Sequence, residues 1–512
     1  MKDSFTQSMD WLHTWGGLLF GWLLFVIFFS GTLTVFDKEI TYWMQPELHH
    51  LPAAALNVDA VTRQLSTLGG NSDHWWIELP TNRLPVTKIF WKRQDQFEER
   101  LIEPLSGKPV AVRDTHGGEF FYRFHYQLHL DRVGVWVVGA SALVMLVALV
   151  TGLVIHRRIF KDFFTFRPRS SPHRAWLDVH NLTGVLVLPF HFMITFTGLV
   201  IFGQIYIPAG VDLLYGGDEE QVVADMEQRI ERSPQHNRAP LVSLETLERR
   251  AREHWDGGTT EWIEVHNPGD RHALVEITRR TDDRLALVSD RVTFDGATGE
   301  TLQVWKATQP AFLTYSVVIG LHYIWFDKIT IRWLYFLMGL AASVMIATGL
   351  VLWTVKRRAR HFDAATTVWY RLVERLNIAI VAGLPIATAA FFWSNRLLPT
   401  DLAGRALWEM RMFFLTWGFC VLHAFLRREW SAAWKEQLYG GGALFACLPL
   451  LNMATTQSHM LITIPNEMWR LAGIDLTSLA TGLLLGWGGR HVGRIGTASQ
   501  PASEPVLETQ QV

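Results

Sequence analysis

Long apolar runs constrain the fold of this 512-residue chain more than any other feature. A membrane hydrocarbon core of about 30 Å requires roughly 20 apolar residues in a helix. The runs predict a polytopic α-helical membrane protein of about eight spans, at Trp11–Phe36, Val133–Ile155, Val179–Tyr206, Ile331–Val355, Leu376–Trp393, Ala406–Leu426, Leu438–Thr455 and Leu471–Gly489. The first run is too long for a signal peptide and lacks a convincing cleavage site, so we interpret it as an anchor.

Basic residues in the short loops set the predicted orientation. They gather on one side, which the positive-inside rule assigns to the cytoplasm. These residues are Arg157, Arg158, Lys161, Arg167, Arg169, Arg174, Lys356, Arg357, Arg358, Arg360, Arg427, Arg428, Lys435, Arg490 and Arg494. Both termini are therefore expected in the cytoplasm, and the polar tail is expected to be disordered.

Two long polar segments, Asp37–Arg132 and Gln204–Thr330, remain on the outer side. Each starts with a helical stretch, continues with strand-like alternation and closes on a hairpin signal that contains Gly107 or Gly299. The helical stretches are Val58–Leu68 and Leu244–Trp255, and the alternation of the second segment includes Trp262–His266. The pattern predicts two small α+β modules. The predicted division is a first transmembrane helix at 1–36, an outer module at 37–132, helices 2 and 3 with the basic loop at 133–206, a second outer module at 207–330, helix 4 at 331–360, a C-terminal membrane domain of helices 5–8 at 361–495 and a tail at 496–512.

Composition excludes several classes of protein. The formal net charge of −1 gives no basic surplus for nucleic acid. The chain has two cysteines and no CxxCH motif, which excludes a disulfide scaffold, an iron–sulfur protein and covalently attached haem. No P-loop, flavin or nicotinamide motif is present. By contrast, the chain has 20 histidines, and several lie in or beside the apolar runs.

An internal repeat organises these histidines. His13 precedes the pair Ser30-Gly31 by 17 residues, and His180 precedes Thr197-Gly198 by the same 17. The second and fourth spans also match, with His129 and His322 before them and the pairs Thr151-Gly152 and Thr348-Gly349 near their ends. The first 360 residues thus resemble two parallel copies of helix, outer module and helix, and the last four spans form an addition.

Paired histidines on facing helices are the ligand set of non-covalent b-type haem. The repeat pairs His13 with His180 and His129 with His322, which predicts a four-helix core with one bis-histidine haem b near each face. His125 lies one turn before His129, and His191 lies deeper in the third span, eleven residues after His180 on nearly the same helix face. His191 is an alternative ligand, with His129 or His322 as its partner, and spacing does not choose between them.

The motifs resemble those of the PepSY-associated transmembrane family, which includes bacterial ferric-siderophore reductases. The resemblance covers about Trp11–Arg360 and rests on the His13 span, Phe124-His-Tyr-Gln-Leu-His129, Asp178-Val-His180 and Gly320-Leu-His322. It implies PepSY-like periplasmic modules and an inner-membrane di-haem oxidoreductase that reduces a ferric siderophore or other ferric chelate on the periplasmic side. The haem ligands would carry over to His13, His180, His129 and His322, with His191 as the alternative.

Reducing Fe(III) weakens its hold on hard oxygen ligands and requires no acid–base residues, so no catalytic side chain is assigned. The electron donor would be a quinol or a cytoplasmic reductase. Two other functions remain open. One is a siderophore or metal permease subunit whose histidines bind metal directly. The other is a PepSY-type regulator of an exported peptidase.

Overall fold

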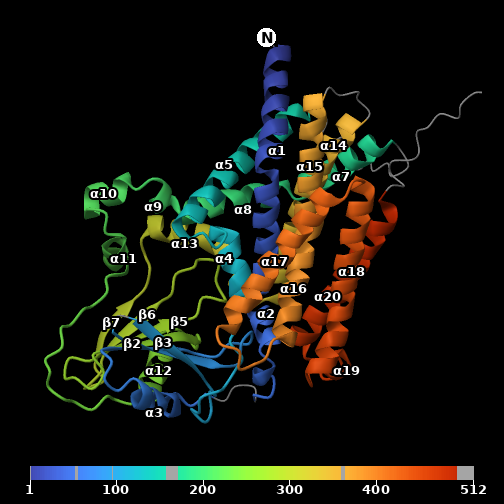
Figure 1. The fold of residues 1–512 in the computed structure, drawn as a ribbon. Helices are drawn as coiled ribbons and strands as arrows, with labels where there is room; N and C mark the ends of the chain where they lie inside the picture. The colour runs from blue at the N-terminus through green and yellow to red at the C-terminus, as the bar shows by residue number, and fades with distance from the viewer. Residues whose placement is uncertain (1, 52–55, 95, 157–170, 359–363, 493–512) are drawn as a thin grey trace, which may run out of the picture.

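The computed structural model describes residues 2–51, 56–94, 96–156, 171–358 and 364–492. Arg157, Arg158, Lys161, Arg167, Arg169, Arg360, Arg494 and the tail at 496–512 lie outside these residues. Most of the long helices form a bundle that runs roughly along α1, while the green segment at residues 172–201 runs across it, and one sheet lies at one end of the bundle (Figure 1). We call this end of the bundle the sheet side and the opposite end the far side.

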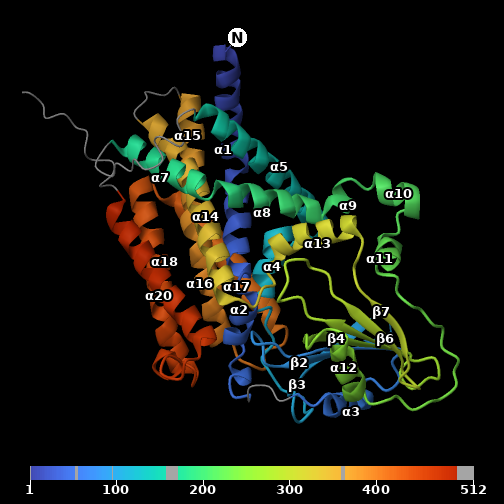
Figure 2. The ribbon, with the colours of Figure 1, turned by 180° about the vertical axis from the view of Figure 1, so that it is seen from behind.

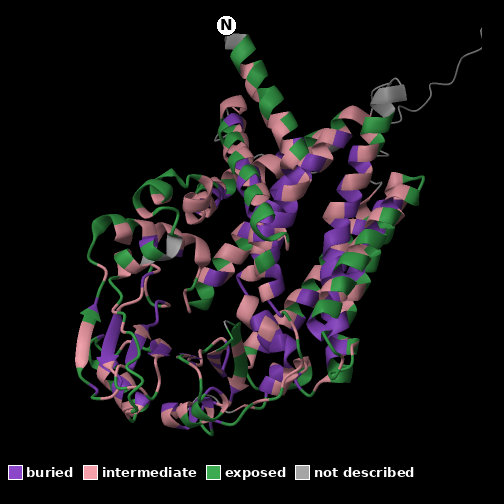
Figure 3. Cartoon of the chain, turned by 60° about the vertical axis from the view of Figure 1, so that its left-hand side comes forward, coloured by how far each residue is buried: buried purple, intermediate pink, exposed green. Residues whose placement is uncertain are grey.

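Seven helices in the described part of the chain are long and apolar enough to cross a membrane, and a bent helix pair raises the number to eight. The chain is therefore a multi-pass membrane protein. Large apolar side chains on the outer surfaces of the helices are exposed, as a lipid-facing surface requires, and the interior is buried (Figure 3). The spans are α1 (Lys2–Thr34), α5 (Asp131–Ile155), α14 (Ile329–Arg358), α15 (Ala364–Asn377) continued through a π-helical turn (Ile378–Ala382) into α16 (Gly383–Leu397), α17 (Arg405–Leu426), α18 (Trp430–Thr455) and α20 (Trp469–His491).

The third apolar run is broken, where one continuous helix was expected. It forms α7 (Pro172–Leu186) and α8 (Leu188–Ile201), which meet at an angle of 65°. Pro189 stands in the first turn of α8. Since proline has no N–H and its ring clashes with the preceding turn, the helix breaks at Val187.

Short helices complete the bundle and link it to the sheet. Two of them lie directly before spans: α4 (Glu119–Gln127) precedes α5, and α13 (Pro310–Tyr323) precedes α14. The others are α2 (Asp37–Met44), a 3-10 turn (Pro46–Leu48), α9 (Gly203–Tyr206), α10 (Ala209–Tyr215), α11 (Glu219–Glu227) and α19 (Met460–Thr463).

The two outer segments share a single sheet instead of forming two separate modules. The sheet has seven antiparallel strands in the order β3-β2-β1-β4-β5-β6-β7, and β1 of the first segment pairs with β4 of the second. The strands are β1 (His74–Glu78), β2 (Thr87–Arg93), β3 (Gln96–Ile102), β4 (Thr260–His266), β5 (Leu274–Arg279), β6 (Arg291–Asp295) and β7 (Thr301–Trp305). Gly107 and Gly299 lie in the turns with φ of 71° and 75°, which glycine adopts without strain.

Helices α3 (Val58–Leu68) and α12 (Leu244–Glu253) cover the face of the sheet that is turned away from the bundle (Figure 2). Their apolar sides pack on Trp75, Ile77 and Ile263 in one core. Asn57 caps α3 by accepting from the Ala60 N–H at 2.8 Å, and Ser243 caps α12 by accepting from the Thr246 N–H at 3.2 Å. The other face of the sheet, which carries the alternate residues, is directed toward the bundle.

The C-terminal helices pack against α2 and the segment before α4 through buried polar contacts. Arg396 donates to the Trp43 carbonyl at 2.6 Å, and the Trp43 indole donates to Asp475 at 3.0 Å. Arg405 is fully buried, pairs with Glu409 and donates to the Asp114 carbonyl at 3.0 Å. The addition is therefore joined to the repeat-built part by satisfied hydrogen bonds, and not only by apolar contact.

Candidate functional site

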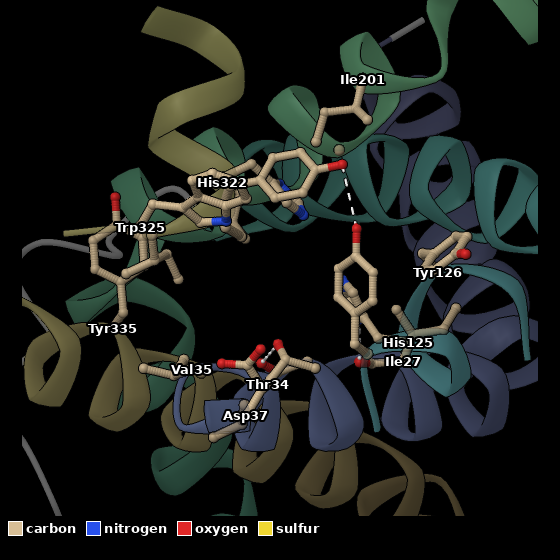
Figure 4. Close-up of a pocket in the computed structure, with 18 of the residues that line it drawn as sticks. Ile27, Thr34, Val35, Asp37, His125, Tyr126, Ile201, His322, Trp325 and Tyr335 are labelled. Carbon is tan, nitrogen blue, oxygen red and sulfur yellow. Dashed lines mark hydrogen bonds between the residues drawn. The ribbon is translucent and has the colours of Figure 1, made fainter. Parts of the chain in front are cut away.

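Two cavities lie inside the bundle, and both are bordered by histidines. The far pocket has a volume of about 330 Å³ and is bordered by His13 of α1 and His180 of α7, with His156 and His173 also at its border. The sheet-side pocket has a volume of about 420 Å³ and is bordered by His125 of α4 and His322 of α13 (Figure 4). The two pairs are at opposite ends of α1, because His13 lies in its first half and His125 contacts its last turns.

The two rings in each pair are separated by the distance that one bound metal ion requires. The centroids of His13 and His180 are 6.4 Å apart, and those of His125 and His322 are 6.0 Å apart. Imidazole nitrogens bind metals at about 2.0–2.1 Å, and a nitrogen lies about 1 Å from its ring centre, so two imidazoles that share one ion have centroids roughly 6 Å apart. Both pairs therefore have the separation of a bis-histidine site.

Hydrogen bonds fix the orientation of the rings. The Nδ1 atom of His13 donates to the Ala148 carbonyl at 2.9 Å, and that of His180 donates to the Met345 carbonyl at 2.8 Å. His125 donates in the same way to the Ile27 carbonyl at 2.8 Å. Because a carbonyl can only accept, the proton is on Nδ1 and the lone pair is on Nε2, which is the tautomer that a metal ligand needs.

His322 follows the same pattern on α8. Its Nδ1 atom lies 3.0 Å from the Thr197 hydroxyl, and the Ile194 carbonyl also accepts from it. The Thr197 hydroxyl donates to the Met193 carbonyl at 2.8 Å, so it accepts from the imidazole. All four rings are thus held through Nδ1.

Each ring rests on a neighbouring helix at a glycine, in an arrangement that we call a socket. A socket consists of a helix carbonyl, a serine or threonine three residues later and a glycine four residues later. A helix carbonyl points toward the residue four positions on, so a glycine there leaves it open to the ring. The glycines of the sockets for His13, His180, His125 and His322 are Gly152, Gly349, Gly31 and Gly198.

The sockets explain why hydroxyl–glycine pairs recur in the four spans. A Cβ on Gly152 would stand 3.1 Å from His13, and one on Gly349 would stand 3.0 Å from His180. At Gly198 the distance to His322 would be 2.9 Å, and at Gly31 the distance to His125 would be 2.6 Å. Carbon atoms in contact are about 3.5–4.0 Å apart, so any side chain at these positions would displace the ring.

The structure places His125, and not His129, beside His322. Leu128 and His129 have φ of 52° and 54°, which ends α4 and turns His129 outward. Its ring stacks on Phe120 at 4.7 Å, and its Nε2 atom donates to the Phe120 carbonyl at 3.0 Å. A nitrogen occupied in this way does not face either pocket.

A signal for His125 is present in the sequence. His125 precedes His322 by 197 residues, and Thr151 precedes Thr348 by the same 197. The distance from His129 to His322 does not match this spacing. The shorter offset of 167 residues joins His13 to His180 and Ser30 to Thr197. Each histidine and a socket residue recur in the second half of the repeat at the same offset. His125 follows this spacing and His129 does not.

His191 lies between the two pockets and borders neither of them. Leu188 of the same helix borders the far pocket and Ile194 borders the sheet-side pocket. The side chain is fully buried, and neither ring nitrogen has a hydrogen-bond partner among the described residues. An unsatisfied buried imidazole is costly and calls for an explanation.

The sheet-side pocket opens toward the sheet through a polar mouth. The Tyr122 and Tyr323 hydroxyls are 3.4 Å apart above the histidines. Glu261, Arg280 and Asp282 border the opening from the sheet. Burial raises the pKa of Glu261 to about 7, in spite of the nearby Arg280. The mouth therefore has both charges and accepts protons near neutral pH.

The repeat-built part of the chain matches a known family. Residues 11–356, more than half of the chain, match the family described as the PepSY-associated TM region. An uncharacterized protein of Pseudomonas aeruginosa is 28% identical over an alignment of 393 residues that covers 73% of this chain and 93% of that protein. The family match covers all four socketed histidines and their sockets. The chain belongs to the PepSY-associated TM region family.

Proposed function

We propose that the chain is a di-haem b oxidoreductase of the bacterial inner membrane that reduces a ferric siderophore or other ferric chelate at the sheet side. The observation that carries the proposal is that each of two cavities is bordered by a socketed pair of imidazoles, whose protons are on Nδ1 and whose Nε2 atoms are free to bind iron. His13 and His180 would hold one haem, and His125 and His322 would hold the other. A bound haem b takes up and releases one electron at a time, which is the chemistry that converts Fe(III) to Fe(II).

The donor set and the cavities fit this cofactor. Two neutral imidazoles suit iron, and the four ligands carry no cysteine or carboxylate that would favour another metal. Glycines in the sockets and Gly17 and Gly184 beside the far pocket leave flat space against the helix backbones. Both cavities are within the range of about 300–1,000 Å³ that is typical of ligand and cofactor sites.

The chain's own residues perform three tasks in this function. The socket carbonyls and hydroxyls hold each imidazole in one tautomer, which fixes the ligand before the cofactor arrives. The helices exclude water from the path between the pockets, where His191 is a buried polar group. The mouth of the sheet-side pocket, which faces the sheet, provides the docking surface for the ferric chelate. It carries the hydroxyls of Tyr122 and Tyr323 and the charges of Glu261 and Arg280.

The proposed topology follows the basic loops. The far side would be cytoplasmic, with a quinol or a cytoplasmic reductase as the electron donor, and the sheet would be periplasmic. A haem held by His125 and His322 would supply one electron for each Fe(III) bound at the mouth, and the chelate would hold the resulting Fe(II) less tightly. The C-terminal helices have no part in this scheme.

A visible spectrum of the detergent-purified protein, reduced minus oxidised, tests the proposal together with a count of haem per chain. We expect a b-type spectrum and about two haems per chain. The double change His13→Ala and His180→Ala should remove one haem, and His125→Ala should weaken the other. His129→Ala is the matched control, because it removes a histidine only one turn away and should leave both haems.

Activity is tested separately with the reduced protein under anaerobic conditions. A ferric chelate should reoxidise it, and a chelator specific for Fe(II) should capture one ferrous ion per electron released. A protein that binds no haem after reconstitution would contradict the proposal, as would a haem-loaded protein that no ferric chelate reoxidises.

A further inference from the structure

A second cluster of histidines lies in the middle of the sheet, outside both pockets. His74 of β1 is paired with His266 of β4, and Glu264 stands two residues before His266 on the same strand. Trp75 and Ile77, the alternate residues of β1, point into the core beneath α3 and α12. The cluster therefore lies on the opposite face, the one directed toward the bundle.

The three side chains converge on one point. The Glu264 carboxylate is 3.9 Å from the Nε2 atom of His74 and 3.9 Å from that of His266. One ligand atom from each residue lies within 4.8 Å of the others. Atoms bound to one ion at about 2.1 Å are roughly 3.4 Å apart in a tetrahedral site, so each side chain would move by less than about 1 Å.

At least one nitrogen at this point has no hydrogen-bond partner among the described residues. The Nε2 atom of His74 is buried and has no hydrogen-bond partner there. A buried imidazole nitrogen without a partner is costly and calls for a group that satisfies it.

The neighbouring charged groups do not fully pair the Glu264 carboxylate. Arg229 is 3.8 Å from Glu264 and 4.0 Å from Glu276, and Arg291 lies 3.8 Å from Glu276. The carboxylates of this face are thus shared among the arginines. The other charged groups that act on the cluster are Asp73, Lys92, Glu227 and Glu231.

We propose that His74, Glu264 and His266 form a binding site for one divalent first-row transition-metal ion. Two imidazoles and one carboxylate are the ligand set of both Zn²⁺ and non-haem Fe²⁺ sites with an open position. Trp76 and Phe97 flank His74, while its side chain remains 22% exposed and that of His266 remains 32% exposed, which leaves a route for the ion. The site goes beyond the proposed function and requires no haem.

Its position relates it to the sheet-side pocket. Glu78 and Trp262, which border that pocket, are partners at the other end of the same strand pair. Four residues of strand separate Glu78 from His74, or about 13 Å. A divalent ion that leaves the pocket mouth therefore finds the cluster on the same face of the sheet.

Equilibrium dialysis of the full-length purified protein against Zn²⁺ tests the site, with zinc and haem counted in the same samples. We expect His74→Gln and His266→Gln each to weaken binding of one zinc ion by at least tenfold and to leave the haem count unchanged. His254→Gln is the matched control, since His254 is exposed on the covered side of the sheet and has no part in the cluster. It should leave zinc binding as it is.

Arg229→Gln supplies an independent measurement that does not remove a ligand. Loss of the guanidinium next to Glu264 should tighten zinc binding at least threefold, because one positive charge beside the ion is gone. X-ray absorption of the zinc-loaded protein should show scattering from two imidazoles that His266→Gln reduces to one. Unchanged zinc binding in both histidine variants would overturn the proposal, and so would weaker binding in Arg229→Gln.

Discussion

The substitution Gly31→Ala tests the socket that holds His125. The added Cβ would stand 2.6 Å from Nδ1 and 2.7 Å from Cε1 of the ring. Contacts of this kind are relaxed at about 3.5 Å, so the ring must retreat by roughly 0.8 Å. The hydrogen bond from Nδ1 to the Ile27 carbonyl, now 2.8 Å, would lengthen to about 3.6 Å and be lost.

The energetic consequence is that a buried N–H loses its only carbonyl. Such a loss costs about 1–3 kcal/mol, and each 1.4 kcal/mol is a factor of ten in affinity. We therefore expect haem at the sheet side to bind about ten- to a hundredfold more weakly in Gly31→Ala. Haem at the far side should remain, because His13 and His180 rest on other glycines.

The assay is a haem titration of the apoprotein, followed in the visible region, with the two sites resolved by their reduction potentials. Gly473→Ala is the control, because a Cβ at this position in α20 meets nothing within 4 Å. Two haems bound to Gly31→Ala with unchanged affinity and potentials would refute the socket argument. The same series predicts milder effects at Gly198, Gly349 and Gly152, in that order, as the distance to the ring grows.

Two further predictions concern groups that the sockets do not involve. His191→Leu should keep both haems and unfold at an equal or higher temperature, since it removes two buried nitrogens without partners; loss of one haem would make His191 a ligand instead. Glu261 has a pKa of about 7 in the fold against about 4.5 unfolded, so the folded state binds the proton more tightly. The free energy of unfolding of the sheet should therefore be highest below about pH 4.5 and fall by up to about 3 kcal/mol between pH 4.5 and 7. Glu261→Gln should reduce that slope in hydrogen exchange of β4 without abolishing it, because burial also raises the pKa of Glu264 on the same strand to about 7; an unchanged slope would contradict the assignment.

Much of the fold can be read from local sequence. Apolar length is sufficient to identify the spans, since a membrane helix satisfies its own backbone hydrogen bonds and depends little on its neighbours. Residues Val58–Leu68 were expected to be helical and form α3, and the alternation before His266 was expected to be a strand and forms part of β4. The break at Pro189 also has a local cause, although a continuous span was expected there.

The union of the two outer segments has no local signal. His74 and His266 are 192 residues apart in the sequence, yet they are partners in the central strand pair. Each segment by itself ends in a strand with a free edge, and alternation does not say which edge pairs with which. The cluster of His74, Glu264 and His266 depends on this pairing, so the local sequence contains no signal for it either.

The different positions of His125 and His129 also lack a local signal. They lie one turn apart, so a continuous helix would present both on nearly the same face. The helix instead ends at Leu128 with a left-handed residue that is neither glycine nor asparagine, a conformation that the sequence does not announce. Only the spacing shared by ligands and sockets distinguishes them.

Some helices carry a ligand for one pocket and a socket for the other, and this arrangement couples the two ends of the bundle. Helix α1 supplies His13 to the far pocket and the socket at Gly31 to the sheet-side pocket. The bent pair α7 and α8 does the same with His180 and the socket at Gly198. A slide of α1 by one residue, about 1.5 Å along its axis, would therefore misplace a ligand at one end and a socket at the other. Since both ends must be in register at once, the two sites constrain each other through rigid helices, and a repeat that duplicates ligand and socket together preserves this register in both halves.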